Sequence, residues 1–297
     1  MHQPLLAPLV LLVCLLASGT AGANEPLPRP AGLESNVRFW TRIYSEVDSR
    51  GGLIHDTRHL DVVYESVLFS KGMSRRARER VVEKAKRRTA AVLKRLAGGK
   101  RTGLSESEAQ ALALWPAGVS NATLRAAARN IRFQLGQADR FKAGLARAGA
   151  WRDDIEQVLS GAGVPLELSA LPHVESSFNP LAYSSVGAAG LWQFTRSTGR
   201  LFMRVDNVID ERLDSHKASV GAAKLLRANY DRLGTWPLAI TAYNHGVAGI
   251  ARAVRKVGTT DIATISKTYK GRTFGFASRN FYAEFLAALE IDRNAER

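Results

Sequence analysis

The sequence predicts an all-α, mainly helical protein, and three observations support that fold class. Apolar residues recur at helical spacing along most of the chain, helix-capping patterns precede several of these segments, and strand-like alternation is rare. Hydrophobic residues make up 45% and charged residues 23% of the 297 residues. This composition is typical of a globular protein and excludes a disordered or collagen-like chain.

Residues 1–23 have the pattern of a secretory signal peptide. Residues 5–17 form an almost wholly apolar run, shorter than the roughly 20 residues that span a membrane, and Ala21-Gly22-Ala23 resembles a cleavage site. No Lys or Arg precedes the run, so an uncleaved membrane anchor is the alternative. We therefore expect an exported protein, periplasmic or associated with the cell envelope. Because Cys14 is the only cysteine, the mature chain is expected to have no disulfide, cysteine–zinc site or cysteine nucleophile.

Residues 24–140 are predicted to form a Pro-rich linker followed by a basic helical region. Pro26, Pro28 and Pro30 favour an extended segment. Helical spacing of apolar residues follows from Val37 to Val47, and the pair Gly51-Gly52 interrupts it.

The most basic part of the chain lies between Lys71 and Arg101. It holds 13 Lys and Arg residues and two acidic residues, yet it keeps an apolar stripe at helical spacing. A solvated face on an ordinary helix is the simpler interpretation, and an anion-binding face is the alternative. Because an exported protein rarely meets nucleic acid, we expect no nucleic-acid partner. Anionic wall polymer or a membrane surface is the favoured partner of such a face.

Two further helices are predicted between this region and the middle of the chain. Ser105 followed by Glu108 has the form of a capping box and predicts a helix through Leu114. Asn121 fits a glycosylation sequon and equally the N-cap of a helix from Leu124 to Leu135.

Glu175 is the acidic residue whose surroundings favour catalysis. Pro165 is suited to a helix start, and interior Pro172 leaves either one bent helix or two short pieces, with Glu175 near the helix C-terminus in both cases. The negative end of a helix and apolar neighbours both disfavour a carboxylate. A carboxylic acid that keeps its proton near neutral pH can act as a general acid. From position alone, an exposed residue at the helix end without function is the simpler interpretation, and the residues downstream favour the catalytic one.

Small and aromatic residues follow Glu175. Gly187-Ala188-Ala189-Gly190 lacks bulk and lets a ligand, or another helix, approach the backbone closely. Leu191-Trp192-Gln193-Phe194 then supplies an aromatic surface and an amide.

These residues resemble the signature of the soluble-lytic-transglycosylase-like family, whose members have the goose-type lysozyme fold and cleave peptidoglycan. The first motif is Glu175-Ser176-x-Phe178-Asn179-Pro180-x-Ala182-x-Ser184-x-x-Gly187-Ala188-x-Gly190-Leu191-Trp192-Gln193, with Thr198, and the second is Ala242-Tyr243-Asn244-x-Gly246. The segment from Phe274 to Tyr282 resembles the membrane-bound type D branch. The resemblance implies a lysozyme-like helical catalytic domain over residues 141–297, with the N-terminal helical region packed against it.

The resemblance also implies a role for each matching residue. Glu175 would be the catalytic acid and base. The predicted substrate-binding residues are Ser184, Gly190, Gln193, Thr198, Tyr243 and Asn244. Neither a cofactor nor a metal is expected. His55 and His59 have zinc-like spacing, but the sequence shows no third ligand.

The implied reaction cleaves the β-1,4 bond between N-acetylmuramic acid and N-acetylglucosamine and leaves a 1,6-anhydro end. One carboxyl group suffices for it. Local spacing supplies only one, because Glu167 on a continuous helix would lie about 12 Å away along the axis and point elsewhere. Two alternatives stay open: a hydrolytic lysozyme that uses a distant acid such as Asp210, Glu211 or Asp214, and a non-catalytic peptidoglycan-binding or scaffolding protein. The sequence does not indicate an oligomeric state.

Overall fold

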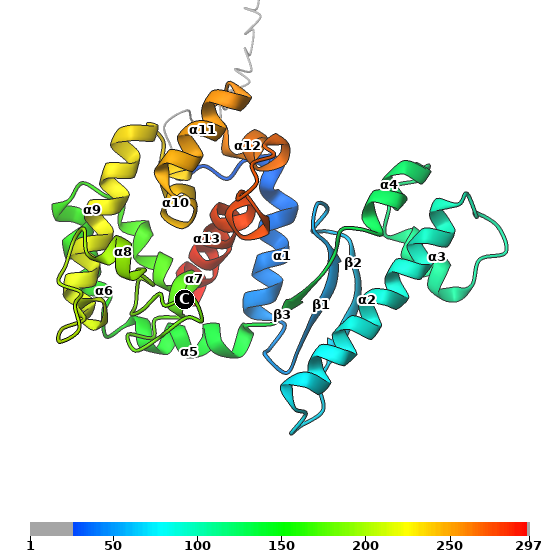
Figure 1. The fold of residues 1–297 in the computed structure, drawn as a ribbon, viewed down its shortest axis with the longest axis horizontal. Helices are drawn as coiled ribbons and strands as arrows, with labels where there is room; N and C mark the ends of the chain where they lie inside the picture. The colour runs from blue at the N-terminus through cyan, green and yellow to red at the C-terminus, as the bar shows by residue number, and fades with distance from the viewer. Residues whose placement is uncertain (1–25, 296–297) are drawn as a thin grey trace, which may run out of the picture.

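The computed structural model describes residues 26–295, so the predicted signal peptide lies outside the described residues. A helical lobe lies beside a small sheet that is backed by further helices (Figure 1). The elements that form the lobe and its site are α1 (Glu34–Ser45), α5 (Ala138–Ala148), α6 (Arg152–Gly161), α7 (Leu171–Ser176), α8 (Arg196–Gly199), α9 (Ser215–Leu233), α10 (Trp236–His245), α11 (Val247–Val257), α12 (Ile262–Thr268) and α13 (Phe276–Ala295). The prediction of a mainly helical fold is confirmed.

The lobe is built around α13, which packs against α1, α7 and α10. One apolar core runs from Leu27 to Leu289 and joins helices from both ends of the chain. Phe281, Phe285 and Leu289 recur every four residues and are all buried in it. The core includes residues on both sides of the predicted boundary between residues 140 and 141, and that boundary stays a prediction.

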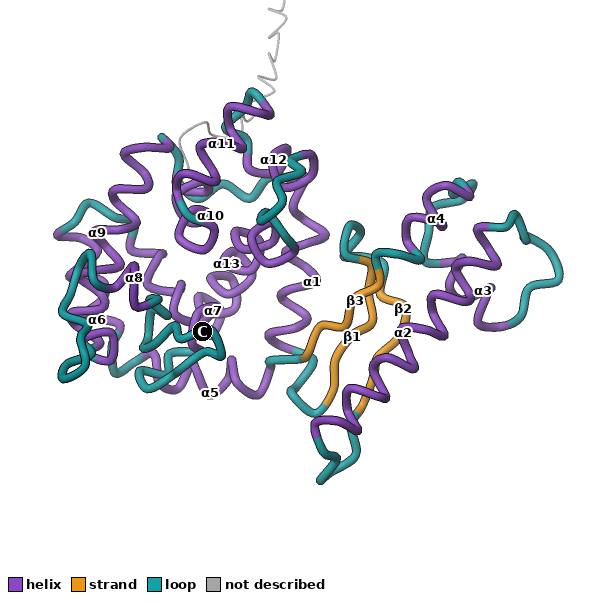
Figure 2. Tube along the Cα trace, viewed as in Figure 1, coloured by secondary structure: helices purple, strands orange, loops and turns teal. Residues whose placement is uncertain are grey.

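A three-stranded antiparallel sheet is the element that the sequence analysis did not predict. Its strands are β1 (Gly51–Asp56), β2 (Val63–Leu68) and β3 (Ile131–Leu135), in the order β2-β1-β3 (Figure 2). Gly51-Gly52, expected only to end a helix, begins the central strand. A Cβ atom at either glycine would overlap a carbonyl oxygen of a neighbouring strand, so both positions require glycine.

The predicted helix from Leu124 to Leu135 is wrong in its second half. The helix here, α4 (Asn121–Ala127), is capped by Ser120 rather than by Asn121, and the chain then enters β3. In β3 the apolar side chains of Ile131 and Phe133 alternate with Arg132 and pack against α2. Tertiary packing of this short alternating segment overrides the helical spacing.

The basic segment folds into α2 (Arg75–Ala97), as predicted, with α3 (Glu106–Ala113) beside it. Its apolar stripe faces the sheet, α3 and α4, while the sheet separates α2 from the helical lobe (Figure 1). The opposite face of α2 carries exposed cations that form no ion pair within residues 26–295, and we call them the cationic stripe: Arg76, Arg80, Lys84, Arg87 and Lys94. At about 1.5 Å per residue the stripe is about 27 Å long.

Both halves of the capping box predicted at Ser105 are formed with Glu108. Within residues 26–295, no helix combines the length and apolarity needed to cross a membrane.

Candidate active site

Glu175 lies on α7, a short helix anchored to the centre of the lobe. The two-piece alternative for this segment is the one observed: a 3₁₀-helix over Leu166–Ala170 precedes α7, and Pro172 falls near the start of the second piece. His173 is buried, stacks on Phe141 and hydrogen-bonds Asp292 of α13 at 2.9 Å. These contacts place α7, and therefore Glu175, against two other helices.

The backbone turns sharply directly after Glu175. Ser177 and Phe178 have φ angles of 52° and 54°, a left-handed conformation that is uncommon for residues with a side chain. The Arg147 guanidinium donates two hydrogen bonds, of 2.6 and 3.2 Å, to the carbonyl oxygen of Ser177. Phe178 is buried in the core. A charge-assisted contact and apolar packing therefore hold a strained turn next to the candidate acid.

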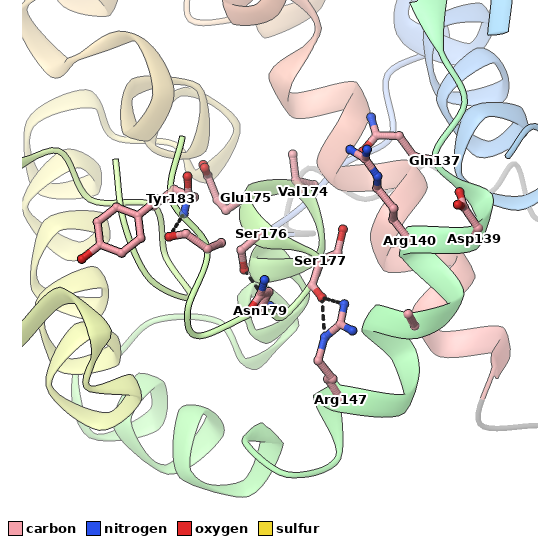
Figure 3. Close-up of a pocket in the computed structure, with 13 residues that line it drawn as sticks. Gln137, Asp139, Arg140, Arg147, Val174, Glu175, Ser176, Ser177, Asn179 and Tyr183 are labelled. Atoms are coloured by element: carbon pink, nitrogen blue, oxygen red, sulfur yellow. Dashed lines mark hydrogen bonds between the residues drawn. The ribbon is translucent and has the colours of Figure 1, made fainter. Parts of the chain in front are cut away.

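Glu175 lines an open cleft of about 500 Å³ (Figure 3). The walls come from α5, α7 and the loop that ends at Gln193. The Glu175 side chain is partly buried and accepts no hydrogen bond from the described residues. Burial raises its pKa from 4.5 to about 8. Glu175 therefore keeps its proton at neutral pH, the state that a general acid requires.

Tyr243 of α10 lies close to Glu175. Its hydroxyl donates a hydrogen bond of 2.8 Å to the carbonyl oxygen of Trp192. Burial raises the pKa of Tyr243, and the negative charge of Glu175 raises it further. Trp192 is itself buried and donates through Nε1 to Ser219. The two predicted motifs thus meet through a hydrogen bond beside the candidate acid.

Gln193 lines the cleft together with Glu175, whereas Tyr243 does not. It has a φ of 48°, and its side-chain nitrogen donates to the carbonyl oxygens of Ala182 and Gly190. Because these bonds orient the amide, its oxygen is left to accept a hydrogen bond from a ligand.

The other predicted residues do not line this cleft. The hydroxyl of Ser184 accepts from the backbone of Ala188, and Thr198 takes part in the N-cap of α8. Asn244 is exposed and accepts a hydrogen bond from the hydroxyl of Ser278. Their substrate contacts stay predictions.

Gly190 has a structural reason to be glycine. Its φ is +79°, and a Cβ atom would overlap the carbonyl oxygen of Arg212. Its N–H donates to Ala182, and its carbonyl oxygen accepts from Gln193. The predicted contact between the Gly190 backbone and a substrate stays untested, and tight loop packing by itself accounts for this residue.

Two groups at the site were missed by the sequence analysis. Arg140 and Arg147 of α5 line the cleft beside Glu175 (Figure 3). Their spacing of seven residues on an amphipathic helix was the available signal. Glu284 of α13 is the second group, and no local pattern links it to Glu175.

Glu284 is a second carboxyl group in the electrostatic neighbourhood of Glu175. Burial raises its pKa to about 8, the charge of Glu175 adds to the increase, and Arg132 acts in the opposite direction. The distant acids considered from sequence have other partners. Asp210 pairs with Arg212, Glu211 with Lys217, and Asp214 caps α9.

The described residues contain no group of three or more His, Cys, Asp or Glu side chains suited to a metal. His55 is buried in β1, and burial lowers its pKa to about 4. Its Nδ1 lies 3.0 Å from the carbonyl oxygen of Asp56.

Comparison with known families places this site in a recognised class of domain. Residues 158–266 match the model of the transglycosylase SLT domain. This region contains Glu175, Gln193 and Tyr243, so the resemblance predicted from the motifs is confirmed.

Curated relatives are similar to part of the chain, and one of them is a type D transglycosylase. The chain is 31% identical to membrane-bound lytic murein transglycosylase D of Escherichia coli K12 over 136 residues, which are 45% of this chain and 29% of that protein. It is also 35% identical over 98 residues to a putative tributyltin chloride resistance protein of an Alteromonas species, covering 32% of this chain and 46% of that one. The matched part thus spans less than half the length of either relative.

Two solved structures are similar at a lower level. The 70 kDa soluble lytic transglycosylase of Escherichia coli aligns with 74% of this chain and 35% of its own, at 20% identity and a TM-score of 0.39. An inactive mutant of the lytic transglycosylase Slt of Pseudomonas aeruginosa aligns with 49% of this chain and 24% of its own, at 20% identity and a TM-score of 0.39.

Proposed function

We propose that the protein is a peptidoglycan lytic transglycosylase with Glu175 as its single acid and base. The observation that carries the proposal is the position of Glu175 in the wall of the cleft, where burial raises its pKa to about 8 and so favours the protonated acid at neutral pH. The SLT domain match over residues 158–266 and the similarity to a murein transglycosylase support the substrate class.

In the proposed reaction, Glu175 first donates a proton to the leaving group and then accepts a proton from the substrate. Its carboxyl group gives a proton to the glycosidic oxygen as the bond from that oxygen to C1 of N-acetylmuramic acid breaks. N-Acetylglucosamine leaves with a free 4-hydroxyl group, and the substrate's own acetamido group assists the electron-poor C1. The Glu175 carboxylate then takes the proton of the C6 hydroxyl, whose oxygen bonds to C1. Water is not consumed, and a 1,6-anhydro end forms.

Six predicted residues support the substrate in this proposal. Gln193 accepts a hydrogen bond through its amide oxygen, and Tyr243 lies beside the reacting sugar. Ser184, Gly190, Thr198 and Asn244 line a more extended glycan path. Mass spectrometry of digested sacculi tests the reaction, because an anhydro end is lighter than a reducing end by one water. Reducing ends alone would contradict the proposal.

A hydrolytic lysozyme is the second candidate function, and Glu284 is the observation that favours it. A second carboxyl group close to the acid can activate water in a glycosidase once it is ionised, and Glu284, with its pKa raised to about 8, is ionised at alkaline pH. The charge of Glu175 affects the pKa of Glu284, so the two groups are close enough to interact. Reducing ends that disappear in Glu284→Gln would support hydrolysis.

The non-catalytic alternative is separated by Glu175→Gln on purified sacculi. Release of fragments by the parent chain and not by the variant supports an enzyme that uses Glu175. Equal release by both proteins removes Glu175 from the mechanism, and release by neither favours a binding protein.

The proposed location is the cell envelope, reached through the signal peptide predicted at residues 1–23. There, the cationic stripe contacts an anionic wall polymer or a membrane surface. Its unpaired charges on the face of α2 away from the helical lobe support such a contact. Co-sedimentation with purified wall and with anionic vesicles at several salt concentrations tests it.

A further inference from the structure

One wall of the cleft is formed by a regularly spaced face of α5. Arg140, Ala143 and Arg147 all line the cleft that contains Glu175. Residues seven apart on an α-helix differ by only about 20° around its axis and lie about 10.5 Å apart along it. The side chains of Arg140 and Arg147 therefore arise from the same side of α5 (Figure 3), and the cleft-lining residue between them in sequence, Ala143, is small.

Arg140 has free hydrogen-bonding capacity in this wall. It is exposed, and within residues 26–295 it has no ion pair or side-chain hydrogen bond. The neighbouring acid, Asp139, also lines the cleft, but it accepts hydrogen bonds from the backbone and hydroxyl of Ser49. These bonds lower the pKa of Asp139 against the opposing effect of burial and direct its carboxylate toward Ser49.

Arg147 has a structural role and one remaining donor group. Its Nε and Nη2 donate hydrogen bonds to the carbonyl oxygen of Ser177, and the other terminal nitrogen, Nη1, has no partner in the described part of the chain. Glu175 is protonated at neutral pH, so it contributes no charge there. With two arginines and one ionised aspartate, this side of the cleft carries a net positive charge.

We infer that Arg140, with Arg147 behind it, binds the carboxylates of the stem peptide on the muramic sugar, so that the enzyme acts on peptide-bearing strands. This inference rests on the proposed function. The N-acetylated sugars of the glycan are neutral, and their substituent peptides are anionic. Planar guanidinium groups match carboxylates in a bidentate geometry. The spacing of about 10.5 Å corresponds to about three residues of extended peptide.

The test compares two glycan substrates and three variants. Peptide-bearing strands are compared with strands from which an amidase has removed the peptides, which exposes the lactyl carboxylate. The variants are Arg140→Gln, Arg140→Lys, which keeps the charge and loses the planar fork, and Lys142→Gln. Lys142 is an exposed cation of α5 that does not line the cleft.

With Arg140→Gln, we expect KM for peptide-bearing strands to rise about tenfold, because a charge-assisted contact is lost, while kcat stays close to that of the parent chain. Arg140→Lys should recover part of the loss, and Lys142→Gln should resemble the parent. On stripped strands, Arg140→Gln and the parent should have the same KM. Unchanged KM on peptide-bearing strands would overturn the inference. An equal increase on both substrates would also overturn it, because the arginine would then contact the lactyl carboxylate or the glycan.

A binding measurement separates this inference from the proposed reaction. Titration calorimetry with a muramyl tetrapeptide and with its fully amidated form requires no turnover. The inference is supported if the parent chain binds the acid form and hardly binds the amide, and if Arg140→Gln binds the acid form at least fivefold more weakly. This holds even if no strand is cleaved. Equal affinity for the acid and the amide rejects it, whatever the outcome of the cleavage assay.

Discussion

Replacing Glu175 with Gln should abolish activity and stabilise the fold above neutral pH. In the folded chain, burial raises the pKa of Glu175 from 4.5 to about 8. The pKa of Glu175 is higher in the folded chain than in the unfolded chain. The folding stability that depends on its protonation is therefore fully present below about pH 4.5 and is lost as the pH rises through about 8. At about 1.4 kcal/mol per pKa unit, complete ionisation of buried Glu175 costs at most about 5 kcal/mol of folding stability.

The measured effect should be smaller, because the side chain is partly exposed and solvent screens its charge. We expect about 1–3 kcal/mol in favour of Glu175→Gln at pH 9, equivalent to roughly 2–12 °C in Tm, and almost no difference at pH 4.5. Glutamine cannot donate the catalytic proton, so fragment release should fall at least about 100-fold at every pH.

The assay is a series of thermal melts of both proteins from pH 4.5 to 9, with fragment release from sacculi measured on the same samples. Glu106→Gln, on the exposed side of α3 and outside the cleft, is the matched control and should follow the parent chain in both assays. A Tm difference between Glu175→Gln and the parent that does not depend on pH would refute the burial argument.

Three further results are expected. In urea denaturation, Gly190→Ala should lower the free energy of unfolding by roughly 3 kcal/mol, because the new Cβ would overlap the carbonyl oxygen of Arg212. The control Gly187→Ala, also at positive φ but with open space around it, should lower it by only about 1–2 kcal/mol. Equal losses for the two variants would contradict the clash. Glu284→Gln removes a neighbouring negative charge and should lower the pKa of Glu175, so the alkaline limb of the pH–activity profile should move to lower pH while anhydro products persist. An alkaline limb at the same pH would show that Glu284 and Glu175 do not interact. Neutralising two residues of the cationic stripe should weaken binding to anionic vesicles or wall about tenfold at 50 mM salt and hardly at all at 500 mM, whereas a loss that salt does not change would exclude an electrostatic contact.

Local patterns predicted the helices with strong amphipathic spacing. The apolar positions of α1 and α2 and the capping box of α3 are observed as expected. The sheet was missed because its central strand begins with two glycines and its third strand continues an apparently helical pattern. Both depend on contacts with strands that are distant in sequence, which local spacing does not encode.

The candidate site was predictable only in part for the same reason. The apolar residues around Glu175 predicted a raised pKa, and the structure attributes the shift to burial. Glu284 approaches from the C-terminal helix, and Arg140 from a helix well before the motif. Such residues are brought together by packing rather than by spacing along one helix, so they could be identified only from the three-dimensional structure.

The contacts between residues 28–29 and helix α13 have a consequence for the choice of protein fragments. Tyr282 of α13 donates a hydrogen bond of 2.7 Å to the carbonyl oxygen of Pro28, and Arg29 pairs with Glu290 at 2.7 Å. The helix that supports α7 is therefore in contact with residues 28 and 29, near the beginning of the described part of the chain. A fragment cut to residues 158–266 would leave out both α1 and α13, so we expect the stretch that matches the family model to fold poorly on its own.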